Sequence, residues 1–149
     1  MEAVLASLVA VIGTLAAAFG GLVIQSRTSR KDQLRSAAAR FAHRLSVHRG
    51  HLYDRWEIAQ QQSPDPAEVR AANDKSNASR SDITLALYEL RVLTRNADLL
   101  RLAEAAVAAT YAVKPRGEDL RALTPADVEA RRQCGITADT AFLAAAAVL

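Results

Sequence analysis

The sequence predicts an all-α protein whose N-terminal transmembrane helix continues into a cytoplasmic antiparallel helical hairpin or bundle. Three observations lead to this class. An uncharged apolar segment lies near the N-terminus, apolar residues then recur at helical spacing, and turns that carry Pro or a helix-capping Asn separate the later segments. Apolar residues make up 50% of the 149 residues but aromatic residues only 5%, so alanine, the best helix former, carries much of the apolar content.

The apolar segment, residues 3–24, contains no charged side chain. As a helix it would be about 33 Å long at ~1.5 Å per residue, which matches a hydrocarbon core of roughly 30 Å. A cleaved signal peptide would begin with basic residues, whereas here the acidic Glu2 precedes the segment. We therefore predict a transmembrane helix over residues 1–26.

A cluster of cations follows this helix: Arg27, Arg30, Lys31 and Arg35. Residues 25–55 hold eight Lys and Arg against two Asp, a net charge of +6. Cations flank a span on its cytoplasmic side, so we expect a single-pass protein of the cell membrane with its N-terminus outside and its C-terminal region in the cytoplasm. The four cations are expected to contact anionic membrane lipids, at about 1 kcal/mol each.

Small residues recur every fourth position within the predicted span, at Gly13, Ala17 and Gly21. This spacing lets two transmembrane helices approach closely, so it predicts helix packing and a homo-oligomer. The alternative is that the spacing only reflects the abundance of Ala and Gly in the chain.

The region 27–149 is expected to form a cytoplasmic α-helical bundle. Its four predicted helices cover approximately residues 27–61, 66–95, 97–113 and 125–148. Asp65 with Pro66 has the chemistry of a helix start, and so do Asn96 and the pair Thr124 and Asp127.

A short turn near residue 64 would make the first two of these helices antiparallel. It would pair positions whose numbers sum to about 128, so that His48 faces Ser79 and Trp56 faces Ala72. Large side chains then meet small ones, and the polar His48 meets a hydroxyl, which favours this register.

No metal, cofactor or catalytic site is predicted. On a helix His48 and His51 share a face, but no carboxylate or cysteine completes a metal-ligand set there. The single cysteine, Cys134, lies on an apolar face and is interpreted as a buried structural residue. The sequence has no Gly-rich phosphate loop, nucleophile elbow or metalloprotease motif, so we expect no enzymatic activity.

The first bundle helix carries Arg40, Arg44, Arg49 and Arg55. At 100° per residue these arginines fall on both flanks of the apolar seam and form no single basic stripe. A solvated helix whose arginine stems cover the seam is the preferred interpretation. Nucleic-acid binding by residues 27–55 remains the alternative.

Several segments together resemble a known family. They are "VIGTL" within the span, the exit with Gln25 and Arg27, the long basic helix, "LYELRVLTRNADLLRLAEAA" at 87–106 and the terminal "AFLAAAAVL" at 141–149. The chain is similar to the KilB-like small single-span membrane proteins of actinobacteria, named after a Streptomyces plasmid-transfer protein. The resemblance implies a membrane-associated role in the spread of conjugative plasmids, and it implies no catalytic residues.

The sequence thus leads to the hypothesis of a non-enzymatic, membrane-bound interaction or scaffold module. DNA-transfer proteins are its expected partners. Two alternatives stay open at this stage: a membrane-tethered nucleic-acid-binding protein, and a lysis or toxic membrane factor.

Overall fold

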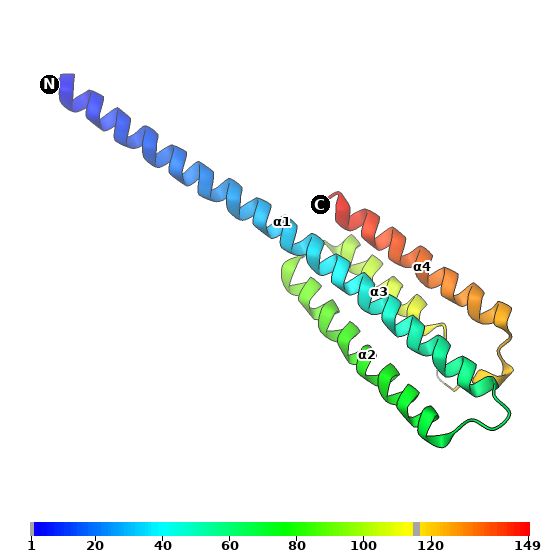
Figure 1. Ribbon diagram of the computed structural model, residues 1–149. Coiled ribbons are helices and arrows are strands. Elements are labelled where there is room, and N and C mark those ends of the chain that lie inside the picture. Colours follow the sequence, from blue (N-terminus) through cyan, green and yellow to red (C-terminus); the bar gives the residue numbers. More distant parts are fainter. Residues whose placement is uncertain (1, 115–116) are drawn as a thin grey trace. The chain divides into compact units, whose positions relative to one another are not determined.

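The computed structural model describes residues 2–114 and 117–149, with side chains from residue 29 onward (Figure 1). The chain divides into two units, residues 1–33 and residues 34–149, and each is described by itself. In the first unit the described backbone is helical and belongs to α1 (Glu2–Gln60), which continues without a break into the second unit.

The predicted span at 3–24 lies outside the residues whose side chains are described, and so do Gly13, Ala17, Gly21 and Arg27. Among the residues that are described, no helix has a stretch both long enough and apolar enough to cross a membrane.

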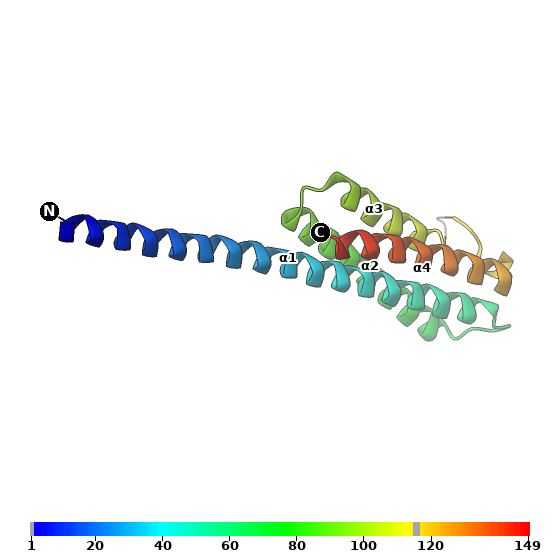
Figure 2. The same cartoon turned by 90° about the horizontal axis from the view of Figure 1, so that it is seen from above.

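The described residues of the second unit form a bundle of four α-helices: the part of α1 from Leu34 onward, α2 (Pro66–Leu93), α3 (Ala97–Tyr111) and α4 (Pro125–Ala147). Consecutive helices run in opposite directions, as Figures 1 and 2 show. The prediction of an all-α fold is confirmed, and α2, α3 and α4 begin and end within two residues of the predicted bounds. A 3₁₀ turn, η1 (Leu120–Ala122), lies in the segment before α4 and was not predicted.

Local side-chain chemistry explains where the helices begin. Asp65 accepts a hydrogen bond from the Ala67 backbone N–H at 2.9 Å, with Pro66 as the first residue of α2. Thr124 and Asp127 form a reciprocal capping box at the start of α4. Such caps satisfy backbone donors that have no partner within the helix.

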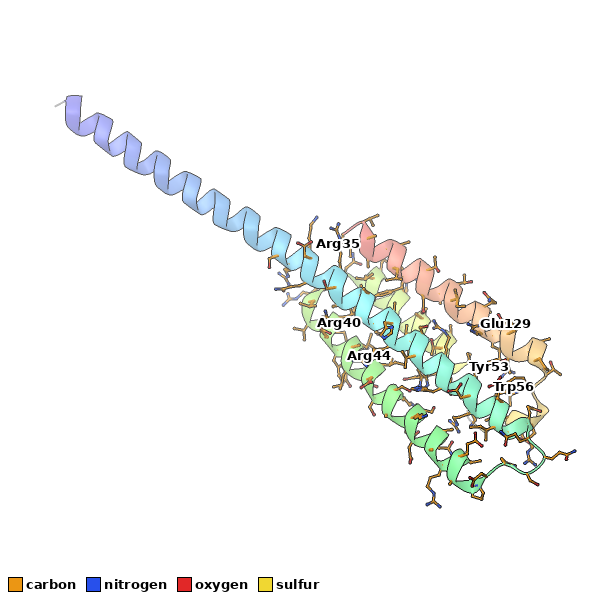
Figure 3. All side chains as sticks on the ribbon, viewed as in Figure 1. Arg35, Arg40, Arg44, Tyr53, Trp56 and Glu129 are labelled. Carbon is orange, nitrogen blue, oxygen red and sulfur yellow. The ribbon has the colours of Figure 1, made fainter. Side chains whose placement is uncertain are left out.

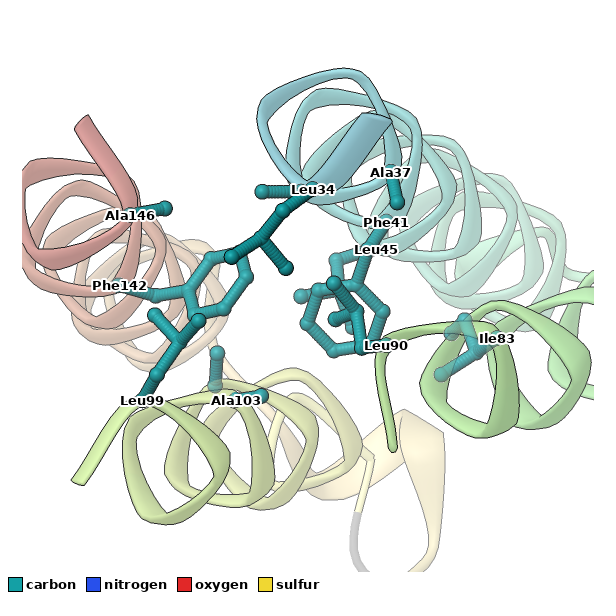
Figure 4. Close-up of a cluster of buried hydrophobic side chains, with 12 residues drawn as sticks. Leu34, Ala37, Phe41, Leu45, Ile83, Leu90, Leu99, Ala103, Phe142 and Ala146 are labelled. Carbon is teal, nitrogen blue, oxygen red and sulfur yellow. The ribbon is translucent and has the colours of Figure 1, made fainter. Parts of the chain in front are cut away.

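The main core lies along the axis of the bundle, where all four helices contribute side chains (Figure 4). Phe41 of α1 and Phe142 of α4 meet edge to face, with ring centres 5.2 Å apart. Leu45 and Ile83, which the predicted register places opposite each other, are both buried in this cluster. Burial of such side chains contributes roughly 1.5–3 kcal/mol each, so this core accounts for much of the bundle's stability.

A second apolar cluster lies near the end of α1 that joins α2, and it corrects one predicted pairing. Trp56 packs there with Leu123 and Val128, and its indole N–H donates to the Leu123 carbonyl oxygen at 3.0 Å. The predicted register placed Trp56 opposite Ala72 of α2. The indole packs instead against the segment before α4, where its ring is buried and its N–H has an acceptor.

Candidate functional site

Three large apolar side chains of α2 lie in solvent. Leu85, Tyr88 and Val92 are 66%, 54% and 81% exposed. Their spacing of three and four residues places them on one face of the helix, which we call the α2 row. The buried positions of α2, such as Ile83 and Leu90, lie on its other side. A row of this kind contributes nothing to the bundle core and suits contact with another protein.

One flank of α4 also carries large apolar side chains, but they are more covered than the α2 row. Ile136 and Leu143 are 37% and 38% exposed. The α2 row is therefore the stronger candidate for a protein-interaction surface.

The arginines of α1 are largely engaged within the bundle. Arg40 forms an ion pair with Glu89 of α2, and Arg44 pairs with Asp82 at 3.1 Å. Figure 3 labels both arginines on α1. These pairs are half-exposed and worth about 1 kcal/mol or less each, but they neutralise charge that the helix would otherwise offer to nucleic acid.

Arg49 is only 5% exposed, which corrects the expectation that it is a solvated residue. Its Nη1 donates to Thr110 Oγ1 at 2.8 Å, and its Nη2 donates to Asp139 Oδ2 at 2.5 Å. Burial raises the pKa of Asp139, and the hydrogen bond and charge of Arg49 oppose this effect only in part. The other oxygen of this carboxylate, Oδ1, is buried without a hydrogen-bond partner among the described residues.

This buried arginine also explains why one prediction on α4, the burial of Cys134, is wrong. Cys134 was expected to be a buried structural residue, yet it is exposed. The buried face instead contains Gly135 and Asp139, because the Arg49 side chain fills the space beside Gly135 and pairs with Asp139. An apolar pattern cannot identify a face on which a glycine and a carboxylate receive a buried cation.

His48 and His51 share a partner, as their helical spacing suggests. The Nδ1 atoms of both rings lie within hydrogen-bond distance of Ser79 Oγ, at 2.8 Å for His48 and 3.1 Å for His51. Burial, with smaller contributions from the charges of His51, Arg80 and Arg55, lowers the pKa of His48 to about 4. The contact between His48 and Ser79 confirms the predicted register of α1 against α2.

In the part of the chain that the structure describes, no group of three His, Cys, Asp or Glu residues is arranged to hold a metal ion. The expected membrane-surface residues Arg30 and Lys31 are exposed. Arg35 is exposed as well, and its Nη2 donates to the Ala147 carbonyl oxygen at 3.2 Å.

The α2 row escaped sequence reasoning, although a signal for it exists. The apolar residues of α2 that pack in the core, such as Ile83 and Leu90, form one seam along the helix. Leu85, Tyr88 and Val92 are large, lie outside that seam and repeat at helical spacing, which is the pattern of a second apolar face.

Comparison with known proteins gives one family. The family model described as "KilB plasmid transfer protein" matches residues 35–149. This range is the bundle without its first residue, Leu34. Neither the curated proteins nor the solved structures include a match to this chain.

Proposed function

Because the chain belongs to the KilB plasmid transfer protein family, we propose that it is a membrane-anchored, non-enzymatic module that binds other proteins of the DNA-transfer machinery. The α2 row carries this proposal. Three large apolar side chains on one helix face are costly to leave in water, and a partner helix or groove would cover them.

The side-chain contacts of α1 argue against nucleic-acid binding by residues 27–55. Arg40 and Arg44 are paired with acidic residues of α2, and Arg49 is buried against α4. Counterion release on DNA requires cations that can reach phosphates. The proposal therefore assigns this helix to the bundle rather than to DNA.

The proposed anchor is the uncharged segment 3–24, with the bundle on the cytoplasmic side of the cell membrane. The face with Gly13, Ala17 and Gly21 is proposed to pack against a second copy. A reporter that is active only outside the cytoplasm, fused after Leu149, should be silent. Strong activity of that fusion would reverse the orientation.

Photocrosslinking in cells that carry the conjugative plasmid tests the interaction surface. A photoreactive phenylalanine analogue in place of Tyr88 should crosslink to a plasmid-encoded DNA-transfer protein. The same analogue in place of Leu143, on α4, serves as the matched control and should give no such product. The double variant Leu85→Ser, Val92→Ser should lower plasmid-transfer frequency by about tenfold or more, as expected when a central apolar contact is lost.

The fold of each variant is checked with Trp56 fluorescence, since the chain has a single tryptophan and it lies in the bundle. Exposed substitutions should change the free energy of unfolding by about 0.5 kcal/mol or less. Unchanged transfer by a folded double variant would overturn the proposal, and so would identical crosslinks from positions 88 and 143.

A further inference from the structure

A cleft of about 220 Å³ opens between α1, α2 and the end of α3. Its lining includes three cations, Arg55, Arg80 and Lys114, together with His48, Ser76 and Asn77. No Asp or Glu is among the described residues that line it. We call this cavity the basic cleft, and it shares no residue with the α2 row.

The three cations of the basic cleft differ from most arginines of the bundle, which have acidic partners. Among the described residues Arg55, Arg80 and Lys114 form no ion pair, whereas seven other arginines do. Like charges held around one small cavity repel one another and raise the local potential. A bound anion would remove this unfavourable interaction.

A ring contact orients the exposed Arg80 guanidinium, and a hydrogen bond orients that of Arg55. The Arg80 guanidinium carbon lies 4.9 Å from the centre of the Tyr111 ring. Tyr111 is in turn packed edge to face with His48, with ring centres 5.5 Å apart. The Nη1 of Arg55 donates to Ser76 Oγ at 3.3 Å. Guanidinium groups fixed in this way lose little freedom when they bind a phosphate, whose oxygens match their planar set of donors.

The pKa of His48 is affected by the positive charges around the cleft. Its pKa is lowered to about 4, first by burial and then by the charges of His51, Arg80 and Arg55. The ring is therefore neutral at pH 7 and adds no further charge. An anion beside Arg55 and Arg80 would favour the protonated ring and raise this pKa.

A second cavity, of about 330 Å³, adjoins the basic cleft and shares Arg55 and Lys114 with it. Its walls include apolar side chains such as Ile58 and Val69. Two carboxylates also line it: Glu118 is paired with Arg131 at 2.5 Å, and Asp119 accepts a hydrogen bond from the Arg121 backbone N–H at 3.0 Å. Together the two cavities have the size typical of small-molecule sites, about 300–1,000 Å³.

We propose that the basic cleft binds the phosphate of a phosphorylated small molecule, and that the organic part of this ligand lies in the adjoining cavity. Arg55, Arg80 and Lys114 would contact the phosphate, and Ser76 and Asn77 can donate further hydrogen bonds. The walls of the second cavity include acidic and apolar side chains, such as Asp119 and Leu120, so it suits a sugar or a base more than a second phosphate.

Titration of the purified full-length chain in a nonionic detergent tests the site, with calorimetry and the NMR signals of the His48 ring as readouts. Inorganic phosphate should bind and raise the pKa of His48. Uridine 5′-monophosphate should bind at least about tenfold more tightly than inorganic phosphate, because it also fills the second cavity. Uridine, which lacks the phosphate, should not bind measurably.

Matched variants distinguish binding at this site from nonspecific attraction of the ligand to a positively charged protein. Arg80→Gln and Lys114→Gln should each weaken binding of uridine 5′-monophosphate by about tenfold, since each removes a charge-assisted contact. Arg95→Gln, an exposed arginine outside both cavities, should leave binding unchanged. Unaltered Trp56 fluorescence establishes that each variant is folded.

A phosphorylated ligand could also be the end of a nucleic-acid strand, and one further comparison distinguishes this source. A short single-stranded oligonucleotide is titrated with and without its 5′-phosphate. Binding of the phosphorylated oligonucleotide without binding of uridine 5′-monophosphate would overturn the small-molecule proposal in favour of a strand end. Equal losses in Arg95→Gln and Arg80→Gln, or an unchanged His48 pKa at saturating phosphate, would overturn the site itself.

Discussion

Arg49 shows how one side chain determines the packing of three helices. It extends from α1 and binds Thr110 of α3 and Asp139 of α4. Removing one member of such a buried pair typically costs about 3–5 kcal/mol, because the other charge stays buried without a partner. Gly135 is part of the same arrangement, since a Cβ added there would lie 2.9 Å from Arg49 Cδ.

The contact between Gly135 and Arg49 predicts that Gly135→Ala destabilises the bundle. Alanine normally stabilises a helix by about 1 kcal/mol relative to glycine. Here the added methyl group overlaps an arginine that its hydrogen bonds hold in place, and overpacking typically costs about 1–3 kcal/mol. Urea unfolding followed by Trp56 fluorescence should show a lower free energy of unfolding.

Gly50→Ala is the matched control. Gly50 also lies within a helix, but a Cβ at this position would meet no atom within 4 Å. This variant should be as stable as the parent chain or more stable. If both alanine variants stabilise the protein, Arg49 does not occupy the position that the structure gives it.

At the scale of elements, α1 and α2 form the hairpin that the sequence predicted. The contact between His48 and Ser79 and the pairs of Arg40 with Glu89 and Arg44 with Asp82 all join positions whose numbers sum to 126–129. The turn at 61–65 sets this register, because Pro64 and Asp65 end one helix and cap the next.

Charge reversal tests this register in solution. The double variant Arg40→Glu, Arg44→Glu places four acidic groups along the seam and should lower the free energy of unfolding by about 1–2 kcal/mol. Adding Asp82→Arg and Glu89→Arg should restore most of this loss, because each pair is rebuilt with its charges exchanged. Urea unfolding again provides the measurement.

A second pair of substitutions on α2 provides the control for the charge reversal. Glu68→Arg and Asp74→Arg, added to the same double variant, change the net charge equally but lie elsewhere on the helix. They should restore little stability. Equal recovery in both quadruple variants would mean that net charge, rather than the observed pairing, controls stability.

At the scale of the whole molecule, buried ionisable groups give the bundle's stability a pH dependence. The pKa of His48 is about 4 in the folded chain, below its ordinary value of 6.5. The unfolded chain therefore takes up this proton at a higher pH than the folded one does. The contribution of His48 to stability is complete above about pH 6.5 and is lost as the pH falls toward 4.

We compare the free energy of unfolding at pH 6.5 and at pH 4 in the parent chain and in His48→Gln. The decrease on acidification should be larger in the parent chain, by on the order of 1–2 kcal/mol. Asp139 acts in the opposite direction, since its raised pKa lets the folded state take up its proton more readily. Both chains contain Asp139, so the difference between them isolates His48. His43→Gln, at an exposed position, is the control and should follow the parent chain.

Several features of the structure follow from the sequence alone. The helix boundaries, the caps at Asp65, Asn96 and Thr124 and the register of α1 against α2 depend on residues that are near one another in the chain or on a short turn. Local hydrogen bonding and helical periodicity are sufficient to predict such features.

Only the tertiary structure decided which face of α4 is buried and where the polar side chains go. Arg49 and Asp139 are 90 residues apart in sequence, and neither would be buried without the other. The same holds for the basic cleft, whose cations come from α1, α2 and the segment after α3. A sequence pattern records the preference of each residue for water. It does not record the distant partner that makes burial of a charge, or a cluster of like charges, energetically acceptable.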